Sequence, residues 1–178
     1  MSTRIGIVIS STRPTRIGDK VATWVAAHAP EGVEVELVDL REVGLPFLDE
    51  PAKPAMGDYV HETTRAWGEQ VSNFDAMIFV VAEYNGGYTA QLKNAIDTLY
   101  AEWNDLPIGV VGYGYGAAAR AVTALEPVLA TVKAIQVPGP GLVITQHVSA
   151  DGEILDAAPA DEVRALFEQV QAQIPALV

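Results

Sequence analysis

The sequence predicts an α/β domain in which a five-stranded parallel sheet of strand order 2-1-3-4-5 is covered by helices on both faces. Apolar strand-like runs alternate along the chain with segments of helical spacing, a pattern typical of a mainly parallel sheet. Residues 76–81 form an apolar run without interruption, as expected of a central strand covered on both sides. The 178 residues suffice for one well-buried domain, which we expect to span residues 1–178.

The strands and helices can be assigned from the period of the apolar residues. Strands are expected at residues 5–9, 33–37, 76–81 and 107–111, and as two pieces of one interrupted edge strand at 135–137 and 142–144. The alternation within 33–37 favours a strand near the sheet edge. Helices are expected at residues 17–28, 58–73, 89–103, 117–132 and 160–174.

Three details of this assignment depend on particular residues. The connection 39–57 contains three prolines and is therefore expected to be a long loop rather than a helix. Val60 is expected to face inward from the helix that follows. Pro127 is expected to kink its helix or to restart it near Glu126, because proline removes a backbone donor.

Composition excludes several classes of function. The sequence has no cysteine, which excludes disulfides, thiolate metal sites, iron–sulfur clusters and thiol redox chemistry, so any redox reaction would require a bound cofactor. The net charge of −12 opposes binding to nucleic acid or to anionic membranes. Residues 1–4 lead directly into a strand and no segment has the length of a membrane span, so we expect a cytoplasmic protein.

The segment from Ser10 to Gly18 has the character of an anion site. It follows a buried strand and opens a helix, whose N-terminus presents free N–H groups and the positive end of the helix dipole. Arg13, Arg16 and Lys20 are three of only eleven basic residues. Their concentration here indicates a phosphate-binding site. The alternative is an ordinary turn with solvated charges, which would have the same residue pattern.

Two further loops combine glycine with tyrosine. Residues 83–87 follow the third strand and residues 112–116 follow the fourth, and together with flanking Tyr88 they hold or adjoin four of the six tyrosines. In a sheet of order 2-1-3-4-5, ligands bind at the carboxyl ends of strands one and three. Glycine allows close backbone approach and tyrosine supplies aromatic surface. These loops favour a planar ring with a phosphate tail; the alternative is that they only form tight turns.

Other catalytic patterns are missing from the sequence. His28, His61 and His147 have no metal-ligand spacing. No Gly-x-Ser-x-Gly motif, dinucleotide-binding glycine fingerprint or phosphate-loop NTPase motif is present. We therefore expect no metal site, and none of the catalytic residues of these enzyme classes, from the protein.

Three motifs resemble one known family. Ser10 to Gly18, Glu83-Tyr84-Asn85-Gly86, and the helical run from Gln91 to Asp97 are similar to the NADPH-dependent FMN reductase family of NAD(P)H:flavin and quinone oxidoreductases. That family has a flavodoxin-like three-layer fold, and the resemblance extends over nearly the whole chain. Ser10 and Ala82 replace the family's usual glycine and proline, and residues 116–119 carry less glycine before Arg120.

The resemblance implies a bound FMN with NAD(P)H as co-substrate. It implies that the FMN phosphate is held by Ser11, Arg13, Arg16, Ile17 and Gly18. It places the isoalloxazine ring along Glu83, Tyr84, Asn85 and Gly86, mostly against backbone groups. The residues on the other side of the ring would be Tyr113, Gly114 and Gly116.

The implied activity is an FMN-dependent NAD(P)H oxidoreductase. Hydride would pass from NAD(P)H to the bound flavin, and electrons would then pass to a flavin, a quinone or another small-molecule acceptor. The alternatives are a non-catalytic flavodoxin-like electron carrier or flavin-binding module, against which Arg13 and Arg16 weigh, and a family member that no longer binds flavin.

The helix at 89–103 carries an apolar stripe of Leu92, Ile96, Leu99 and Trp103. At helical spacing, such a stripe is explained by packing on the sheet. In the resembling family this helix also builds a subunit interface, which implies a homodimer or homotetramer here.

Overall fold

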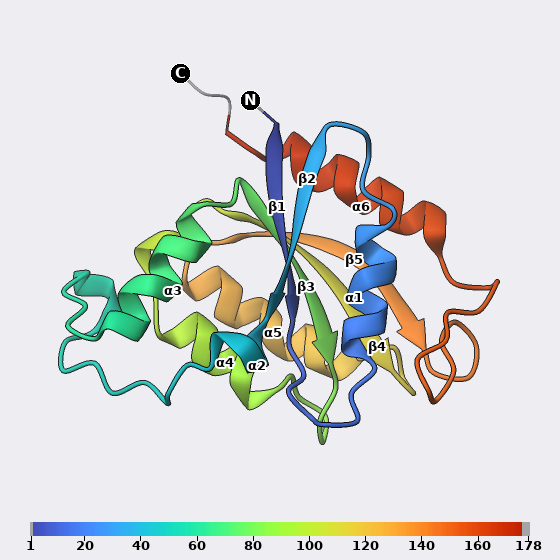
Figure 1. The fold of residues 1–178 in the computed structure, drawn as a ribbon, viewed down its shortest axis with the longest axis horizontal. Helices are drawn as coiled ribbons and strands as arrows, with labels where there is room; N and C mark the ends of the chain where they lie inside the picture. Colours follow the sequence, from blue (N-terminus) through green and yellow to red (C-terminus); the bar gives the residue numbers. More distant parts are fainter. Residues whose placement is uncertain (1, 176–178) are drawn as a thin grey trace.

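The computed structural model describes residues 2–175 and contains one five-stranded sheet of order β2-β1-β3-β4-β5 (Figure 1). All four neighbouring pairs of strands are parallel. The predicted strand order is confirmed, with the alternating strand β2 at one edge. The strands are β1 (Thr3–Ile9), β2 (Val33–Asp39), β3 (Ala76–Ala82), β4 (Pro107–Gly114) and β5 (Ile135–Val143).

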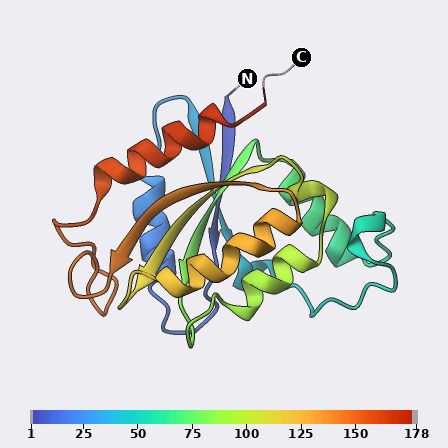
Figure 2. The same ribbon diagram turned by 180° about the vertical axis from the view of Figure 1, so that it is seen from behind.

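Helices cover both faces of the sheet, as predicted. On one face lie α1 (Gly18–Ala26) and α6 (Ala160–Ala172), which are in front in Figure 1. The opposite face, in front in Figure 2, carries α4 (Ala90–Asp97) and α5 (Ala119–Thr131), and α3 (Glu62–Ser72) contributes to the same core. The fold is therefore the three-layer arrangement expected of a flavodoxin-like protein.

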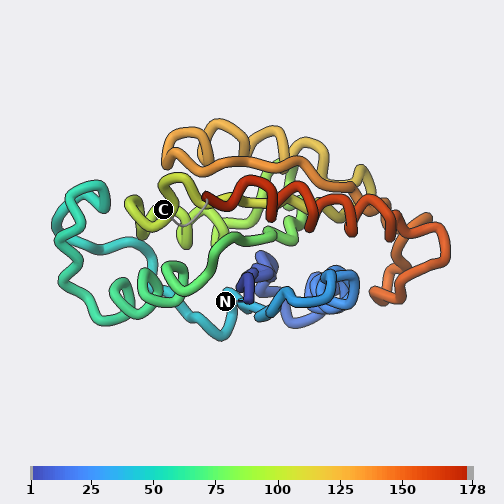
Figure 3. Tube along the Cα trace, turned by 90° about the horizontal axis from the view of Figure 1, so that it is seen from above, coloured from blue at the N-terminus to red at the C-terminus, as the bar shows by residue number. Residues whose placement is uncertain are grey.

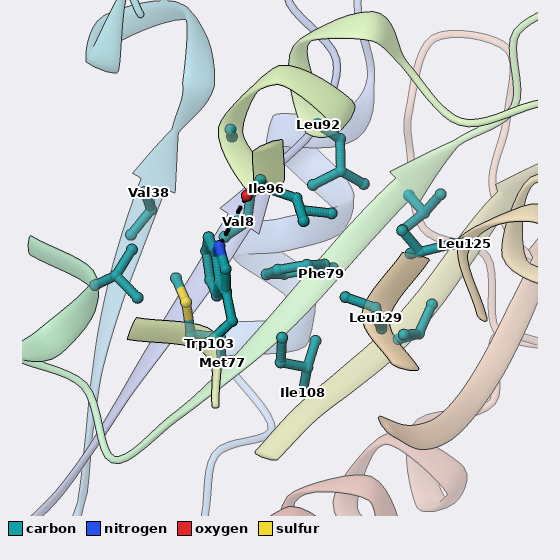
Figure 4. Packing of buried hydrophobic residues seen from close by; sticks show 14 of the residues in the cluster. Val8, Val38, Met77, Phe79, Leu92, Ile96, Trp103, Ile108, Leu125 and Leu129 are labelled. Carbon is teal, nitrogen blue, oxygen red and sulfur yellow. Dashed lines mark hydrogen bonds between the residues drawn. The ribbon is translucent and has the colours of Figure 1, made fainter. Parts of the chain in front are cut away.

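The core consists of two apolar clusters separated by the sheet. Every residue of β3 is buried, which explains its uninterrupted apolar sequence. In the cluster drawn in Figure 4, Trp103 packs edge-on against Phe79 and donates its indole N–H to the Ile96 carbonyl over 3.0 Å. Burial of each such large side chain contributes about 1.5–3 kcal/mol. The apolar stripe at 92–103 packs on the sheet, as its spacing predicts.

The connection after β2 differs from the predicted continuous loop. It contains a short helix, α2 (Leu40–Val43), and a 3₁₀ turn, η1 (Pro54–Met56). The Asp39 side chain caps α2 by accepting the Arg41 N–H over 2.9 Å, and Gly44 ends the helix with φ +62°. The helix forms because it ends before the first proline of the segment.

The prediction of a helix from Asp58 with Val60 inward is wrong. The helix α3 begins at Glu62, and Val60 is 55% exposed. The Glu50 carboxylate accepts the backbone N–H groups of Val60 and His61 over 2.9 and 3.0 Å, and this holds the chain extended before the helix. The segment between β2 and α3 projects at one end of the molecule, opposite the segment that follows β5 (Figure 3).

Two helix predictions need correction. The helix predicted at 89–103 is divided into α4, which ends at Asp97, and a 3₁₀ turn, η2 (Ala101–Trp103). Tyr100 between them has a non-helical backbone and donates its N–H to the Tyr59 hydroxyl over 3.3 Å. The helix α5 does not restart near Glu126. It continues through Pro127 on its exposed face, where water can satisfy the carbonyl that proline leaves without a partner.

The interrupted edge strand is a single strand in the structure. Strand β5 runs through the sequence Pro138-Gly139-Pro140 without ending, and its pairing with β4 shifts register between Val110 and Gly112. A position at the sheet edge tolerates proline, because one side of the strand needs no ladder partner.

Candidate functional site

A cavity of about 680 Å³ lies at the carboxyl ends of β1, β3, β4 and β5. This is the edge at which parallel α/β sheets bind ligands. Ten of the twelve predicted cofactor-binding residues line the cavity: Ser11, Arg13, Arg16, Ile17, Glu83, Tyr84, Asn85, Tyr113, Gly114 and Gly116. The other two, Gly18 and Gly86, pack against the side chains of Tyr113 and Arg120, which do line it.

The loop between β1 and α1 is fixed by buried serines. The Ser10 hydroxyl accepts the Ala82 N–H over 3.1 Å, and the Thr89 hydroxyl donates to the Ser10 carbonyl over 2.8 Å. Ser10 replaces the family's usual glycine and uses its side chain to tie this loop to β3. The helix α1 that follows has no side-chain cap from Ile17. The Lys20 N–H donates to the Ile17 carbonyl and to Asp19 Oδ1, so among the described residues the N–H groups of Gly18 and Asp19 are the ones left to face an anion.

Arg16 is built into this loop by an ion pair. Its guanidinium donates to Asp39 at the end of β2, with an Nη1–Oδ1 distance of 2.8 Å and a second contact from Nη2 to Oδ2. It also donates to the Ser11 carbonyl over 3.1 Å. The Arg16 and Asp39 side chains are only 5% and 10% exposed. Hydrogen bonding to Asp39 raises the pKa of Arg16, which therefore stays charged.

One donor of Arg16 remains unused. Its Nε is buried and has no hydrogen-bond partner within residues 2–175, and the nearest carboxylate oxygen, on Asp19, lies 4.0 Å away. Buried donors in proteins are nearly always paired. An unpartnered guanidinium N–H beside an uncapped helix N-terminus fits an anionic group such as a phosphate.

Arg13 differs from Arg16 in being exposed. Its guanidinium donates to the Thr15 hydroxyl over 3.3 Å and lies 6.0 Å from the centre of the Tyr84 ring. In the described part of the chain it forms no ion pair with a carboxylate. Its charge is therefore available at the rim of the cavity.

The loop after β3 is a tight turn joined to the first loop. Tyr84 and Gly87 exchange backbone hydrogen bonds of 2.8 and 3.1 Å, while Asn85 and Gly86 adopt φ values of +52° and +83°. This is the geometry of a type I′ turn, for which an Asn-Gly pair is the preferred sequence. The hydroxyls of Tyr84 and Ser11 lie 2.5 Å apart, so the two loops are hydrogen-bonded to each other.

The third loop is shorter than predicted, because β4 continues through Gly114. Gly112 and Tyr113 are therefore strand residues. The turn that follows holds Ala117 and Ala118 at φ +55°, a left-handed conformation that costs an L-residue about 1–2 kcal/mol. A Cβ at Gly112 would lie 2.5 Å from the Ala117 carbonyl oxygen, so the tight turn also requires that glycine.

The Glu83 carboxylate is hydrogen-bonded to Arg120 of α5. Arg120 donates from Nε and Nη2 to Glu83 Oε1 over 3.0 and 2.5 Å. This bonding holds the pKa of the Glu83 carboxyl below its usual range, and the backbone N–H groups of Arg120 and Ala121 act in the same direction. Glu83 is therefore an ionised anchor between the second loop and α5, and it is unsuited to act as a proton donor.

Tyr113 lines the cavity from the end of β4 and is almost fully buried. It is 6% exposed and belongs to the core cluster on the α1 face of the sheet, with its hydroxyl against Gly18. Gly114 and Gly116 line the cavity after it, whereas Tyr115 is 76% exposed. The Tyr113 hydroxyl thus reaches toward the first loop, at Gly18.

Several residues of the site escaped the sequence analysis. Asp39, which pairs with the cavity residue Arg16, was expected only as the start of a loop, and this pairing depends on the register of β1 and β2. Ile144 and Ala150 line the cavity from the segment after β5. A usable signal existed for that segment, because the carboxyl end of an edge strand lies beside that of its neighbour. Thr15, Ala82, Tyr115, Ala119 and Arg120 complete the lining.

Residues 2–175 contain no group of three or more histidine, aspartate or glutamate side chains arranged to hold a metal ion. Within the same residues, no helix has the length and apolar character required to cross a membrane.

The sequence and the fold are similar to those of known proteins. A sequence model of the NADPH-dependent FMN reductase family matches residues 3–149. An NAD(P)H-dependent FMN reductase of Schizosaccharomyces pombe is 42% identical over 115 residues, which cover 62% of this chain and 58% of that protein. A quinone reductase of Pseudomonas putida KT2440 is 29% identical over 118 residues, which cover 64% and 61%. The chain thus spans about three fifths of the length of these two relatives.

Among solved structures, the flavoenzyme NAD(P)H:(acceptor) oxidoreductase FerB from Paracoccus denitrificans superimposes with a TM-score of 0.70 and 23% identity, covering 97% of this chain and 95% of that one. Because the sequence identity is only 23%, this structural similarity supports the flavodoxin-like fold alone. The predicted family, with its FMN cofactor, is confirmed by the sequence match over most of the chain. The chain belongs to the NADPH-dependent FMN reductase family.

Proposed function

We propose that this chain binds FMN in the cavity and uses it to oxidise NAD(P)H and reduce a small-molecule acceptor. The observation that carries the proposal is the unpartnered, buried Nε of Arg16 beside the uncapped N-terminus of α1. These groups suit a phosphate, and the glycine-containing turns across the cavity suit a flat ring. Family membership supports the same cofactor.

The phosphate end would be held by preformed donors. Ser11 supplies a hydroxyl, Arg16 its Nε, and α1 its free N–H groups. Arg16 is already neutralised by Asp39, so Arg13 adds the uncompensated positive charge. Each hydrogen bond to a charged phosphate is worth about 1.5–3 kcal/mol.

The ring end would be bound mainly by backbone groups. The type I′ turn at 84–87 and the glycines at 114 and 116 leave the backbone accessible from the cavity. Bound FMN supplies the two-electron chemistry, and the protein orients the ring and excludes side reactions. The Glu83 carboxylate is engaged by Arg120, so the proposed reaction uses no proton from it.

The proposed acceptor is a quinone or another small oxidant that can reach the ring, and the relative from Pseudomonas putida, named a quinone reductase, supports this class.

We further propose a cytoplasmic homodimer or homotetramer in which residues 89–103 form the contact. Phe47 and Met56, in the exposed segment between β2 and α3, are 79% and 65% exposed and would gain from being covered. Light scattering of the FMN-loaded protein tests the assembly, and a monomeric mass at micromolar concentration would oppose it.

Steady-state oxidation of NADPH and NADH tests the activity. FMN-loaded protein is mixed with each nucleotide and p-benzoquinone, and protein without FMN serves as the control. Sustained, FMN-dependent oxidation that requires the quinone is expected. Binding of FMN without any nucleotide oxidation would contradict the enzyme assignment and identify an electron carrier instead.

A further inference from the structure

We propose that Tyr113 is a phosphate-positioning residue that makes the cavity selective for a phosphorylated flavin over the same flavin without a phosphate. This inference rests on the proposed function, because it assumes that FMN occupies the cavity. It gives Tyr113 a role different from the ring contact that the family resemblance implies.

The position of Tyr113 separates it from the ring end. It is the second-last residue of β4 and pairs with Ala82 of β3, so its side chain leaves the sheet on the α1 face. Val111, two residues earlier, lies in the same core cluster. Because 94% of Tyr113 is covered in this way, little of its aromatic face remains for stacking on a flavin.

The hydroxyl of Tyr113 lies at the N-terminus of α1. A Cβ added to Gly18, the first residue of that helix, would lie 2.5 Å from the Tyr113 hydroxyl oxygen. Any side chain at position 18 would therefore displace the hydroxyl. The glycine that the sequence analysis assigned to the phosphate site contributes by making room for Tyr113.

Tyr113 shares the cavity with two other hydroxyl-bearing residues. Ser11, Tyr84 and Tyr113 all line it, and the hydroxyls of Ser11 and Tyr84 lie 2.5 Å apart. Burial raises the pKa of the Tyr113 hydroxyl above its usual value, with the nearby Tyr84 acting in the same direction, so the group stays protonated and can donate. The first loop, the second loop and β4 thus each contribute a hydroxyl-bearing residue to one cavity.

Arg16 supplies a further donor to the same cavity. The Nε of Arg16, the N-terminus of α1 and the Tyr113 hydroxyl come from separate elements, and Arg16 and Tyr113 both line the cavity. A phosphate there would receive the Tyr113 O–H directly or through Ser11. Riboflavin, which has the same ring but no phosphate, would gain nothing from this hydroxyl.

The test compares the binding of FMN with the binding of riboflavin, using protein from which any bound flavin has been removed. Dissociation constants of FMN and riboflavin are measured by fluorescence quenching for the wild type, Tyr113→Phe and Tyr59→Phe. Loss of one hydrogen bond to a charged group should weaken FMN binding to Tyr113→Phe by roughly tenfold or more and leave riboflavin binding unchanged. Tyr59→Phe removes a hydrogen-bonded tyrosine hydroxyl outside the cavity lining and should alter neither constant.

A second variant, together with a measurement of folding, separates a loss of FMN binding from a loss of the fold. Gly18→Ala brings a methyl group onto the hydroxyl and should reduce FMN affinity selectively, while circular dichroism reports whether either variant keeps its fold. Equal weakening of both flavins in Tyr113→Phe, or no weakening of FMN, would overturn the inference. A wild type that binds neither flavin would instead overturn the proposed function on which the inference rests.

Discussion

The two ends of the cavity are stabilised in different ways. The phosphate end is fixed by buried hydrogen bonds and by the Arg16–Asp39 ion pair, whose side chains are almost fully covered. The ring end depends on a turn with two left-handed alanines and on the Glu83–Arg120 pair, in which the Arg120 side chain is 76% exposed. We infer that the phosphate end is preorganised, whereas the ring end tolerates changes in sequence.

The largest effect is expected from Arg16→Ala. Removing one partner of a buried ion pair leaves Asp39 charged and unpaired, which should lower the free energy of unfolding by about 3–5 kcal/mol. FMN affinity should fall as well. Urea denaturation of the wild type, Arg16→Ala and the double variant Arg16→Ala/Asp39→Ala checks the prediction. The double variant should recover part of the loss; a stability equal to the wild type in the single variant would contradict the preorganised phosphate end.

Arg13→Ala should affect binding rather than folding. Because Arg13 is exposed and pairs with no carboxylate among the described residues, its removal should weaken FMN binding by about 1.5–3 kcal/mol and leave the urea midpoint unchanged. Arg164→Ala, an exposed cation on α6, is the matched control and should retain wild-type FMN affinity. An unchanged dissociation constant for Arg13→Ala would remove this residue from the site.

At the ring end, Ala117→Gly should stabilise the protein slightly. Relief of the left-handed conformation exceeds the entropy that glycine adds to the unfolded chain, leaving a gain of about 0.5–1 kcal/mol. Ala124→Gly, on the exposed face inside α5, should have the opposite sign, because φ there is helical. Thermal unfolding of both variants measures the difference. A destabilised Ala117→Gly would mean that the turn is held by contacts of the Ala117 methyl group.

The smallest effect is a change in acid stability from Glu83→Gln. The folded-state pKa of Glu83 lies below its ordinary value, so its contribution to stability is present above roughly pH 4.3 and is lost as pH falls through the folded pKa. Glu83→Gln should therefore flatten the fall in urea midpoint on this acid side. Arg120→Ala should do the same, and a steep wild-type slope in both variants would contradict the role of the pair.

The sequence predicted the sheet and its binding edge because apolar periodicity reports burial directly. It could not predict the partner of Arg16, since Asp39 approaches only through the pairing of Ile9 with Asp39 between β1 and β2. Val60 was misplaced for a similar reason, because a distant carboxylate, Glu50, holds its backbone extended. Local patterns carry no information on such long-range hydrogen bonds.

The side of the sheet that Tyr113 occupies was not predicted, although the sequence contains a signal for it. Side chains in a strand alternate between faces, so Val111 and Tyr113 share one face while Ile108 and Val110 share the other. Had β4 been extended two residues beyond Val111, this alternation would have predicted the side of the sheet that Tyr113 occupies. The glycines at 112 and 114 hid the strand, because they are typical of loops.

The central claim is that this cavity holds FMN in a form that NAD(P)H can reduce. The direct measurement is the visible absorption spectrum of the protein reconstituted with FMN and separated from free flavin, recorded without oxygen before and after addition of NADPH or NADH. We predict a retained flavin spectrum that bleaches on addition of nucleotide and returns when quinone is added. A colourless protein that takes up no FMN would contradict the account.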